Sequence, residues 1–392
     1  MIAFISKFKL LLFLLCALAI AVTVGDLLPN TLKAFFYAIS LSIKNIIVFL
    51  VPLIVFIFLF SSVLSLRNQA GKFIIFILIL VTLSNFTAIN VGYVIGANIL
   101  PIIKFNMIAA SNNLRLIPMW TFTLPQIISI QYTVIVSIIL GLFFAYKPNN
   151  YVNRITEDLN NKVISVLKKI LLPILPLFVF GFFIKLAHEK LLYTLLSSYG
   201  TVMLLIVFSQ ALYTFAMYMF ASGFKLNKCL EYIKNILPAT IIAFSTMSSA
   251  ATLPVTVICT EKNLGDKRFA RIIVPATCNI HTIGSAIGIT ILSLAALNYF
   301  GASIPDFKHF VYFSIFWALA KYAVAGVPGG AIVVAAPLLE TYLGLTPEMI
   351  GIVTAIYLFL DSFGTATNVT CNGAFAIIFR KLYTRGGVRR AT

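Results

Sequence analysis

The chain has 392 residues, of which 61% are hydrophobic and only 10% are charged. Soluble globular domains carry about 25% charged residues, so this composition excludes that class and predicts a polytopic helical membrane protein. Basic residues outnumber acidic ones by 29 to 11, but they lie in short connectors between apolar runs. The positive-inside rule accounts for that placement, so we expect a lipid bilayer rather than nucleic acid as the partner. The five cysteines have no paired spacing and predict neither a disulfide framework nor a metal cluster.

Six apolar segments make up the first half of the chain. They span about residues 8–25, 34–66, 72–101, 117–146, 163–187 and 194–222. Alternate connectors are the more basic ones, and their basic residues are Lys7 and Lys9, Arg67 and Lys72, Lys147, Arg154 and Lys162, and Lys225, Lys228 and Lys234. We expect those connectors to be cytoplasmic, so that six crossings return the chain to the inside. The first segment is interpreted as an uncleaved helix rather than a signal peptide, because no clear cleavage site follows it.

The apolar segment 235–260 breaks this alternation because both of its flanks are basic, with Lys234 before it and Lys262 after it. Both ends are therefore predicted to be cytoplasmic, which makes the segment a re-entrant hairpin. Its centre, Ser248–Pro254, consists of small and hydroxylated residues followed by a helix-breaking proline. Irregular backbone at membrane depth is tolerated where it lines a cavity. The alternative is a proline-kinked helix that spans the membrane.

A second interrupted segment follows a predicted crossing at residues 272–299. Segment 310–343 is broken by the glycine-rich run Gly326–Gly330. If 346–379 is the last crossing and the basic tail after it is cytoplasmic, both ends of 310–343 lie outside. This segment is then the mirror image of the first hairpin. Two interrupted segments of opposite orientation indicate a secondary transporter with inverted repeats and a site near the middle of the membrane.

The last apolar segment carries polar residues on one face. Asp361, Thr365, Asn368 and Asn372 are spaced i, i+4, i+7 and i+11, so they fall on one stripe of a helix. A carboxylate at membrane depth costs roughly 2.5 kcal/mol or more. Its presence therefore predicts a functional site that faces a cavity.

These motifs resemble the glutamate transporter family, the dicarboxylate/amino acid:cation symporters. The resemblance follows the segment order of the whole chain and is most specific at three places: Ser248–Pro254 resembles the first hairpin tip, Ala325–Gly330 the second tip, and Asp361–Thr370 the substrate helix. It implies an all-α fold of eight transmembrane helices plus two re-entrant helical hairpins, arranged as inverted repeats. It also implies a homotrimer that works by alternating, elevator-like access.

By the same resemblance the chain divides into a scaffold and a transport domain. The scaffold comprises residues 1–71, with helices 1 and 2, and residues 102–193, with helices 4 and 5. The transport domain comprises helix 3 at 72–101, helix 6 at 194–222, and the core 223–380, which holds hairpin 1, helix 7, hairpin 2 and helix 8. Residues 381–392 form a basic cytoplasmic tail. We expect a bacterial inner-membrane protein with both termini in the cytoplasm.

The resemblance places the substrate between the hairpin tips and the polar helix. Asp361 matches the aspartate that holds the substrate's amino group, and Asn368 matches the asparagine that takes its carboxylate together with the tips. The family's arginine for an acidic side chain is replaced by Gly364, so we expect a neutral amino acid, including bulky ones that fill this space. The alternative for Gly364 is close helix packing. The expected substrate-binding residues are Ser248, Ser249, Val327, Gly329, Asp361, Gly364, Thr365 and Asn368.

Positions that match the family's sodium ligands have changed. The aspartate of its asparagine-methionine-aspartate-glycine-threonine signature is His281 here, and its second sodium-binding aspartate is Asn372. The third-helix ligand set around Val81, Ser84 and Asn85 is only partly retained. Because two carboxylates are absent, we expect sodium coupling to be lost or reduced, with proton coupling or exchange in its place, and we assign no metal site or cofactor. The coupling positions or former ion sites are Ser84, Asn85, Thr277, Asn279, His281, Lys321 and Asn372.

Two of these residues have more than one interpretation. A histidine titrates near neutral pH, so His281 either couples transport to protons or fills a former ion site as a neutral imidazole. Lys321 matches a position beside another sodium ion of the family. Its ammonium therefore replaces that cation, pairs with Asp361 in the empty state, or reaches the membrane interface.

The favoured function is amino acid transport, without enzymatic activity. One alternative is a sodium- or proton-coupled symporter of acidic amino acids or dicarboxylates. A second is an intramembrane serine-lysine hydrolase that uses Ser249 and Lys321, although the sequence contains no nucleophile elbow to support it. A third is an ion channel or a non-transporting receptor.

Overall fold

The computed structural model describes residues 9–25, 27–64, 71–103, 116–125, 128, 130–190, 192–324 and 329–385. Within these ranges the elements are helices and no strand occurs. Four helices are long and apolar enough to cross a membrane, and four further apolar helices are shorter. The expected class, an all-helical membrane protein, is confirmed in this coarse sense. The count of eight crossings and two re-entrant hairpins stays a prediction.

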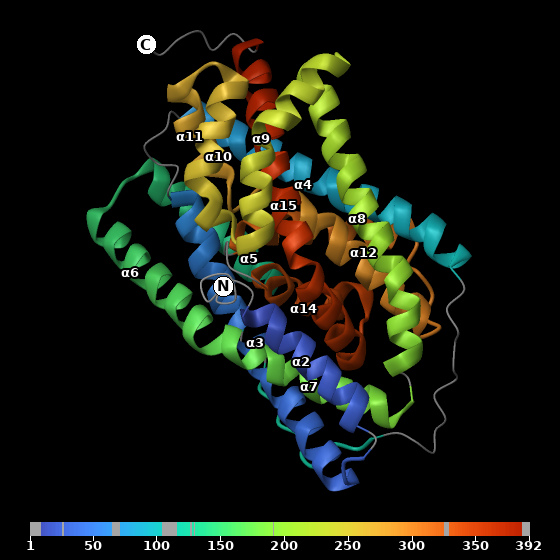
Figure 1. Ribbon diagram of the computed structural model, residues 1–392. Helices are drawn as coiled ribbons and strands as arrows, with labels where there is room; N and C mark the ends of the chain where they lie inside the picture. Colours follow the sequence, from blue (N-terminus) through green and yellow to red (C-terminus); the bar gives the residue numbers. More distant parts are fainter. Residues whose placement is uncertain are drawn as a thin grey trace.

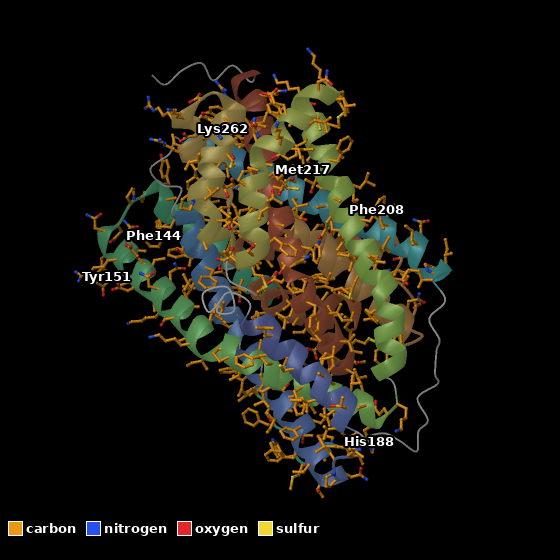
Figure 2. The ribbon with its side chains drawn as sticks, viewed as in Figure 1. Phe144, Tyr151, His188, Phe208, Met217 and Lys262 are labelled. Carbon is orange, nitrogen blue, oxygen red and sulfur yellow. The ribbon has the colours of Figure 1, made fainter. Side chains whose placement is uncertain are left out.

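Long helices from the first half of the chain surround the later ones (Figure 1). The helices α2 (Lys9–Val24), α3 (Asn30–Leu64), α4 (Gly71–Ile99) and α8 (Leu192–Ser222) follow the predicted segments closely. Large apolar side chains cover their outer surface. Phe208 on α8 is one of these, and it points away from the bundle (Figure 2). Such a surface is expected of helices that face lipid.

Two predicted segments differ from the structure. Segment 117–146 is helical only in α5 (Ile130–Tyr146), and the described residues from 116 to 125 form no regular secondary structure. The polar connector before the next segment is itself a helix, α6 (Asn150–Val166), which continues through a π-helical turn into α7 (Leu172–His188). The Asn149 side chain caps α6 by accepting hydrogen bonds from two backbone N–H groups of its first turn. The charges of the connector, which predicted only its side of the membrane, do not indicate this helix or its cap.

The first predicted hairpin is a pair of packed helices, α9 (Leu226–Thr246) and α10 (Ser249–Leu264). The chain turns at Met247, whose φ of 49° is left-handed, and the Ser248 hydroxyl caps α10 by accepting from Ala251 N at 3.3 Å. Pro254 lies inside α10. The expectation that this proline ends the helix is therefore wrong, because the break falls before Ser248.

The second interrupted segment consists of α13 (Phe307–Ala320), a 3₁₀ turn at Lys321–Ala323, and α14 (Gly330–Leu343). Gly329 precedes α14 with a left-handed φ of 71°, a conformation that favours glycine. The predicted tip residues 325–328, Val327 among them, lie outside the described residues, as does the tail from residue 386 onward.

A broken helix and a continuous helix form the centre of the core. The predicted crossing at 272–299 is interrupted: α11 (Lys267–Thr277) and α12 (Ile283–Tyr299) are separated by an irregular stretch. The helix α12 packs on α15 (Pro347–Arg385), which runs through the middle of the bundle (Figure 1). A Cβ atom on Gly284 of α12 would lie 2.1 Å from the carbonyl oxygen of Gly364 on α15. Only glycine permits this approach, which fixes α12 against the polar stripe of α15.

Candidate functional site

A small polar cavity lies between α15, the α11–α12 break and both helical pairs. Its volume is about 20 Å³, enough for about one water molecule. Its lining comprises Met247, Ser249, Cys278, Asn279, Thr282, Ser285, Val324, Ala331, Tyr357, Asp361, Thr365 and Asn368. Five residues that the sequence nominated for substrate or ion binding therefore meet here. They are Ser249, Asn279, Asp361, Thr365 and Asn368.

Asp361 is buried, and hydrogen bonds reach both of its carboxylate oxygens. Gly329 N donates to Oδ2 at 2.8 Å, and the Tyr357 hydroxyl donates to Oδ1 at 3.0 Å. The first contact joins α15 to the start of α14. Tyr357 was missed by the sequence reasoning, although its position four residues before Asp361 places the two side chains on one helix face.

Asn368 contacts the beginning of α12. Its Oδ1 atom accepts a hydrogen bond from Gly284 N at 2.7 Å. The first N–H groups of a helix have no partner within the helix, so this amide satisfies one of them. The contact places the N-terminus of α12 at the edge of the cavity.

Two other asparagines hold the α11–α12 break. Asn85 on α4 donates to Ile280 O at 2.8 Å and accepts from Thr282 N at 3.2 Å. Asn372 accepts from the Thr277 hydroxyl at 2.7 Å and donates to Val274 O at 3.3 Å. Asn372 thus shares the stripe of Asp361 but serves the end of α11 instead of the cavity. The Asn85 amide thus satisfies backbone groups inside the break, whereas Asn372 adds contacts to Val274 O, which already accepts from Cys278 N, and to the Thr277 hydroxyl.

His281 lies in the break and is fully buried. Its Nε2 atom is 2.9 Å from the Ser84 hydroxyl, and its ring packs on Phe375 with the centroids 4.5 Å apart. Its Nδ1 atom has no hydrogen-bond partner among the described residues. An imidazolium would leave an N–H donor unpaired in this interior, so the contacts favour the neutral ring.

Lys321 is fully buried at the end of α13. Its Nζ atom donates to the Ser285 hydroxyl at 2.8 Å and lies 4.4 Å from the centroid of the Trp317 ring. The interpretation that Lys321 reaches the membrane interface does not agree with this burial. Among the described residues Lys321 forms no ion pair with Asp361, so that predicted pair is also not formed in this structure. Sequence reasoning missed Ser285, a polar residue in the apolar run of α12.

Three predicted substrate residues lie beside the cavity without lining it. Ser248 caps α10, and Gly329 reaches the site through its contact with Asp361. Gly364 packs against Gly284, where its own Cβ would meet backbone atoms at 3.9 Å. The backbone of Gly364 therefore lies close to α12, but the position that requires glycine for this packing is Gly284. Its role in substrate selection stays a prediction.

Similarity to known proteins agrees with this architecture. The sequence model of the sodium:dicarboxylate symporter family matches residues 10–382. Excitatory amino acid transporter 1 of Rattus norvegicus is 35% identical over 141 residues, which cover 35% of this chain and 25% of the relative. Excitatory amino acid transporter 5 of Homo sapiens is 34% identical over 163 residues, which cover 40% and 28%. The matched part therefore spans about a quarter of the length of these relatives.

Proposed function

The chain belongs to the sodium:dicarboxylate symporter family, and we propose that it is a secondary transporter that carries a neutral amino acid across the membrane by alternating access. The observation that carries this proposal is the cavity around Asp361. Among its lining residues Asp361 is the only charged side chain, and hydroxyls, amides and helix N-termini surround it. An acceptor-only carboxylate suits an ammonium group, whereas N–H and hydroxyl donors suit a carboxylate.

The absence of a basic residue from this lining supports a neutral substrate. An acidic substrate side chain would enter the cavity without a cationic partner, which is costly in a site of low dielectric constant. We assign the substrate's ammonium to Asp361. Its carboxylate is assigned to Ser249, Asn368 and the N-terminus of α10.

Binding requires the helices around the cavity to move apart. A volume of about 20 Å³ does not admit an amino acid. Asp361 is also satisfied by Gly329 N and Tyr357, so an incoming ammonium competes with the Gly329 contact. We propose that breaking this contact moves the start of α14 away from α15 and links substrate binding to opening.

The ion-site positions support reduced sodium coupling. The oxygens of Asn85 and Asn372 are engaged in hydrogen bonds, and His281 offers a nitrogen. None of the three supplies the negative charge that a carboxylate gives to a bound cation. We propose that sodium is not required for transport. The homotrimer, the inner-membrane location and the cytoplasmic termini are also proposals, and they rest on the family resemblance.

A thermal-shift panel of neutral and acidic amino acids, with sodium or choline, tests the substrate class. We expect neutral amino acids to raise the unfolding temperature in both salts. Asp361→Asn removes a charge-assisted hydrogen bond and should weaken binding about 10- to 100-fold. Asp306→Asn makes the same change in the exposed connector before α13 and should leave binding unchanged. Binding of aspartate or glutamate with no neutral amino acid would overturn the proposal and favour the acidic amino acid or dicarboxylate symporter.

The hydrolase alternative lacks its central contact in this structure. Lys321 donates to Ser285, whereas a serine-lysine pair would need it near Ser249. Labelling of Ser249 by a covalent serine probe, with product formed in detergent, would revive that alternative.

A further inference from the structure

Two side chains of opposite charge are buried together in the substrate core. In the described part of the chain from residue 192 onward, the buried side chains with an acidic or basic group that carries a full charge at neutral pH are Asp361 and Lys321. His281 is also buried, but its unpartnered Nδ1 atom favours the neutral imidazole. The buried charges of this region therefore add up to zero.

Ser285 contacts Lys321 and lines the same cavity as Asp361. Its hydroxyl accepts from Lys321 Nζ at 2.8 Å and donates to Thr282 O at 3.0 Å. Helix α12, which carries Ser285, packs on α15, which carries Asp361, and the Lys321 side chain reaches α12 from the end of α13.

Among the residues that the structure describes, no carboxylate contacts the Lys321 ammonium directly. Its partners among the described residues are one hydroxyl and the face of Trp317, which stabilises a cation through its ring electrons. An ammonium has three N–H donors, so this environment is sparse for a buried charge. Asp361 likewise has only neutral partners. Among the buried acidic and basic side chains of this described region, Lys321 and Asp361 therefore carry the two opposite charges without a direct ionic partner.

We propose that Lys321 is a built-in counter-charge for Asp361, so that the core carries no net charge and a zwitterionic amino acid crosses without a coupled cation. This inference rests on the proposed transport function. With one proton on the pair the net charge is zero in either position, because an amine with a carboxylic acid sums to zero as an ammonium with a carboxylate does. Lys321 then does permanently what a bound cation does in a coupled carrier.

The membrane potential provides the test, because it acts on net charge. One uncompensated charge that crosses the whole field shifts the balance between two carrier orientations by about 50-fold per 100 mV. A core without net charge shows no such shift. Removal of the lysine charge leaves the carboxylate uncompensated, so the balance between the two orientations should then depend on the membrane potential.

The experiment measures uptake of an equimolar mixture of ¹⁴C-labelled neutral L-amino acids into proteoliposomes that contain the full-length protein. Potassium diffusion potentials of either sign are imposed in sodium or choline buffer. We expect uptake by the unmodified protein to change by less than about twofold with potential or with sodium. Lys321→Met should make uptake depend on potential, or on added sodium, by about fivefold or more. Lys321→Arg keeps the charge and should behave as the unmodified protein.

The outcomes separate this inference from the proposed function. No uptake by the unmodified protein would contradict the transport function itself. Uptake that requires sodium or follows the potential would overturn the counter-charge alone. The counter-charge would also be overturned by a folded Lys321→Met variant whose uptake depends on potential and sodium as little as that of the unmodified protein. If that variant does not fold, Lys321→Gln removes the same charge while its amide still reaches toward Ser285, and the same criteria apply.

Discussion

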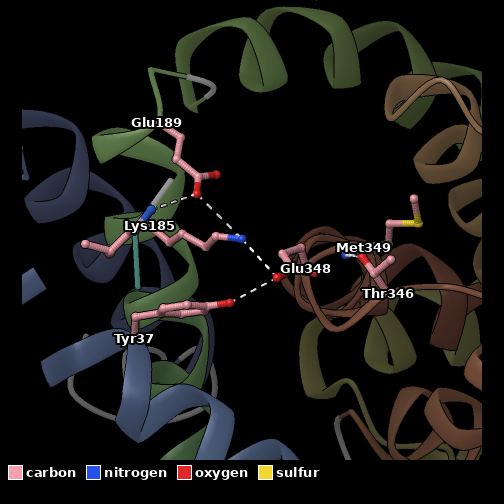
Figure 3. Close-up of polar contacts among 7 residues, drawn as sticks. Tyr37, Lys185, Glu189, Thr346, Glu348 and Met349 are labelled. Carbon is pink, nitrogen blue, oxygen red and sulfur yellow. Dashed lines mark hydrogen bonds and ion pairs between the residues drawn. The ribbon is translucent and has the colours of Figure 1, made fainter. Parts of the chain in front are cut away.

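Two regions of the molecule bury polar groups in opposite ways. At the α11–α12 break, neutral amides and hydroxyls satisfy the backbone. At the boundary between α15 and the outer helices α3 and α7, oppositely charged side chains form ion pairs. Lys185 Nζ on α7 lies 3.0 Å from Glu348 Oε1 and 3.7 Å from Glu189 Oε1, and the Tyr37 hydroxyl donates to Glu348 at 3.0 Å (Figure 3).

A second ion pair joins the outer helix α3 to α14. Lys44 on α3 lies 3.1 Å from Glu340 on α14, whose side chain is 41% exposed. Ions that reach water cost little to separate, because solvent replaces the partner. A dry network of neutral hydrogen bonds offers no such replacement. The core network is therefore expected to resist separation more strongly than the Lys44–Glu340 pair, whose carboxylate reaches water, and the more buried Lys185 cluster is expected to lie between the two.

The largest expected effect tests the rigid core. Gly284→Ala would place a Cβ atom 2.1 Å from the Gly364 carbonyl oxygen, so helices α12 and α15 would have to move apart. We expect a loss of about 3 kcal/mol or more in unfolding free energy, measured by thermal unfolding in detergent. Gly364→Ala is the matched control, because its Cβ would meet only ordinary contacts at 3.9 Å. Equal unfolding temperatures for the two variants would contradict the close contact.

An intermediate effect is expected at the buried ion cluster. Lys185→Met leaves Glu348 and Glu189 without their ammonium, and the Glu348 side chain is only 21% exposed. Removal of one partner from a buried ion pair lowers the free energy of unfolding by about 3 kcal/mol. We expect a somewhat smaller loss here, because solvent reaches part of the Glu348 side chain. The double variant Lys185→Met with Glu348→Gln should recover part of this loss. If both variants unfold at the same temperature, the ion pair is not the source of the stability.

The smallest effect is expected at the exposed end of the boundary. Lys44→Met removes the partner of Glu340, which water solvates. The expected cost is about 1 kcal/mol or less, measured by the same thermal unfolding. High salt should narrow the difference between this variant and the unmodified protein. If Lys44→Met lowers the unfolding temperature as much as Lys185→Met does, solvent exposure does not determine the stability of the two ion pairs.

Local sequence patterns predicted those features that depend only on composition and on the charges of neighbouring residues. Composition indicated a helical membrane protein, and the flanking charges indicated the interrupted segment at 235–260. The same patterns did not predict turns and helix continuations that the residue type does not usually indicate. Met247 adopts a left-handed turn without being glycine, and Pro254 is accommodated inside α10. The break between α11 and α12 falls at Cys278–Thr282, where the polar residues Asn279 and His281 were interpreted as ion-site positions and no sequence pattern gave the ends of the two helices.

By itself, the sequence determined that Asp361, Thr365 and Asn368 share one helix face, because a period of 3.6 residues is a property of the backbone. The structure brings those three residues to one cavity. Only the tertiary structure decided their partners. Lys321 contacts Ser285 instead of Asp361, His281 contacts Ser84, and Asn372 turns to Thr277. These partners lie 36 or more residues apart in the chain, so they depend on how the helices pack, which no local period specifies.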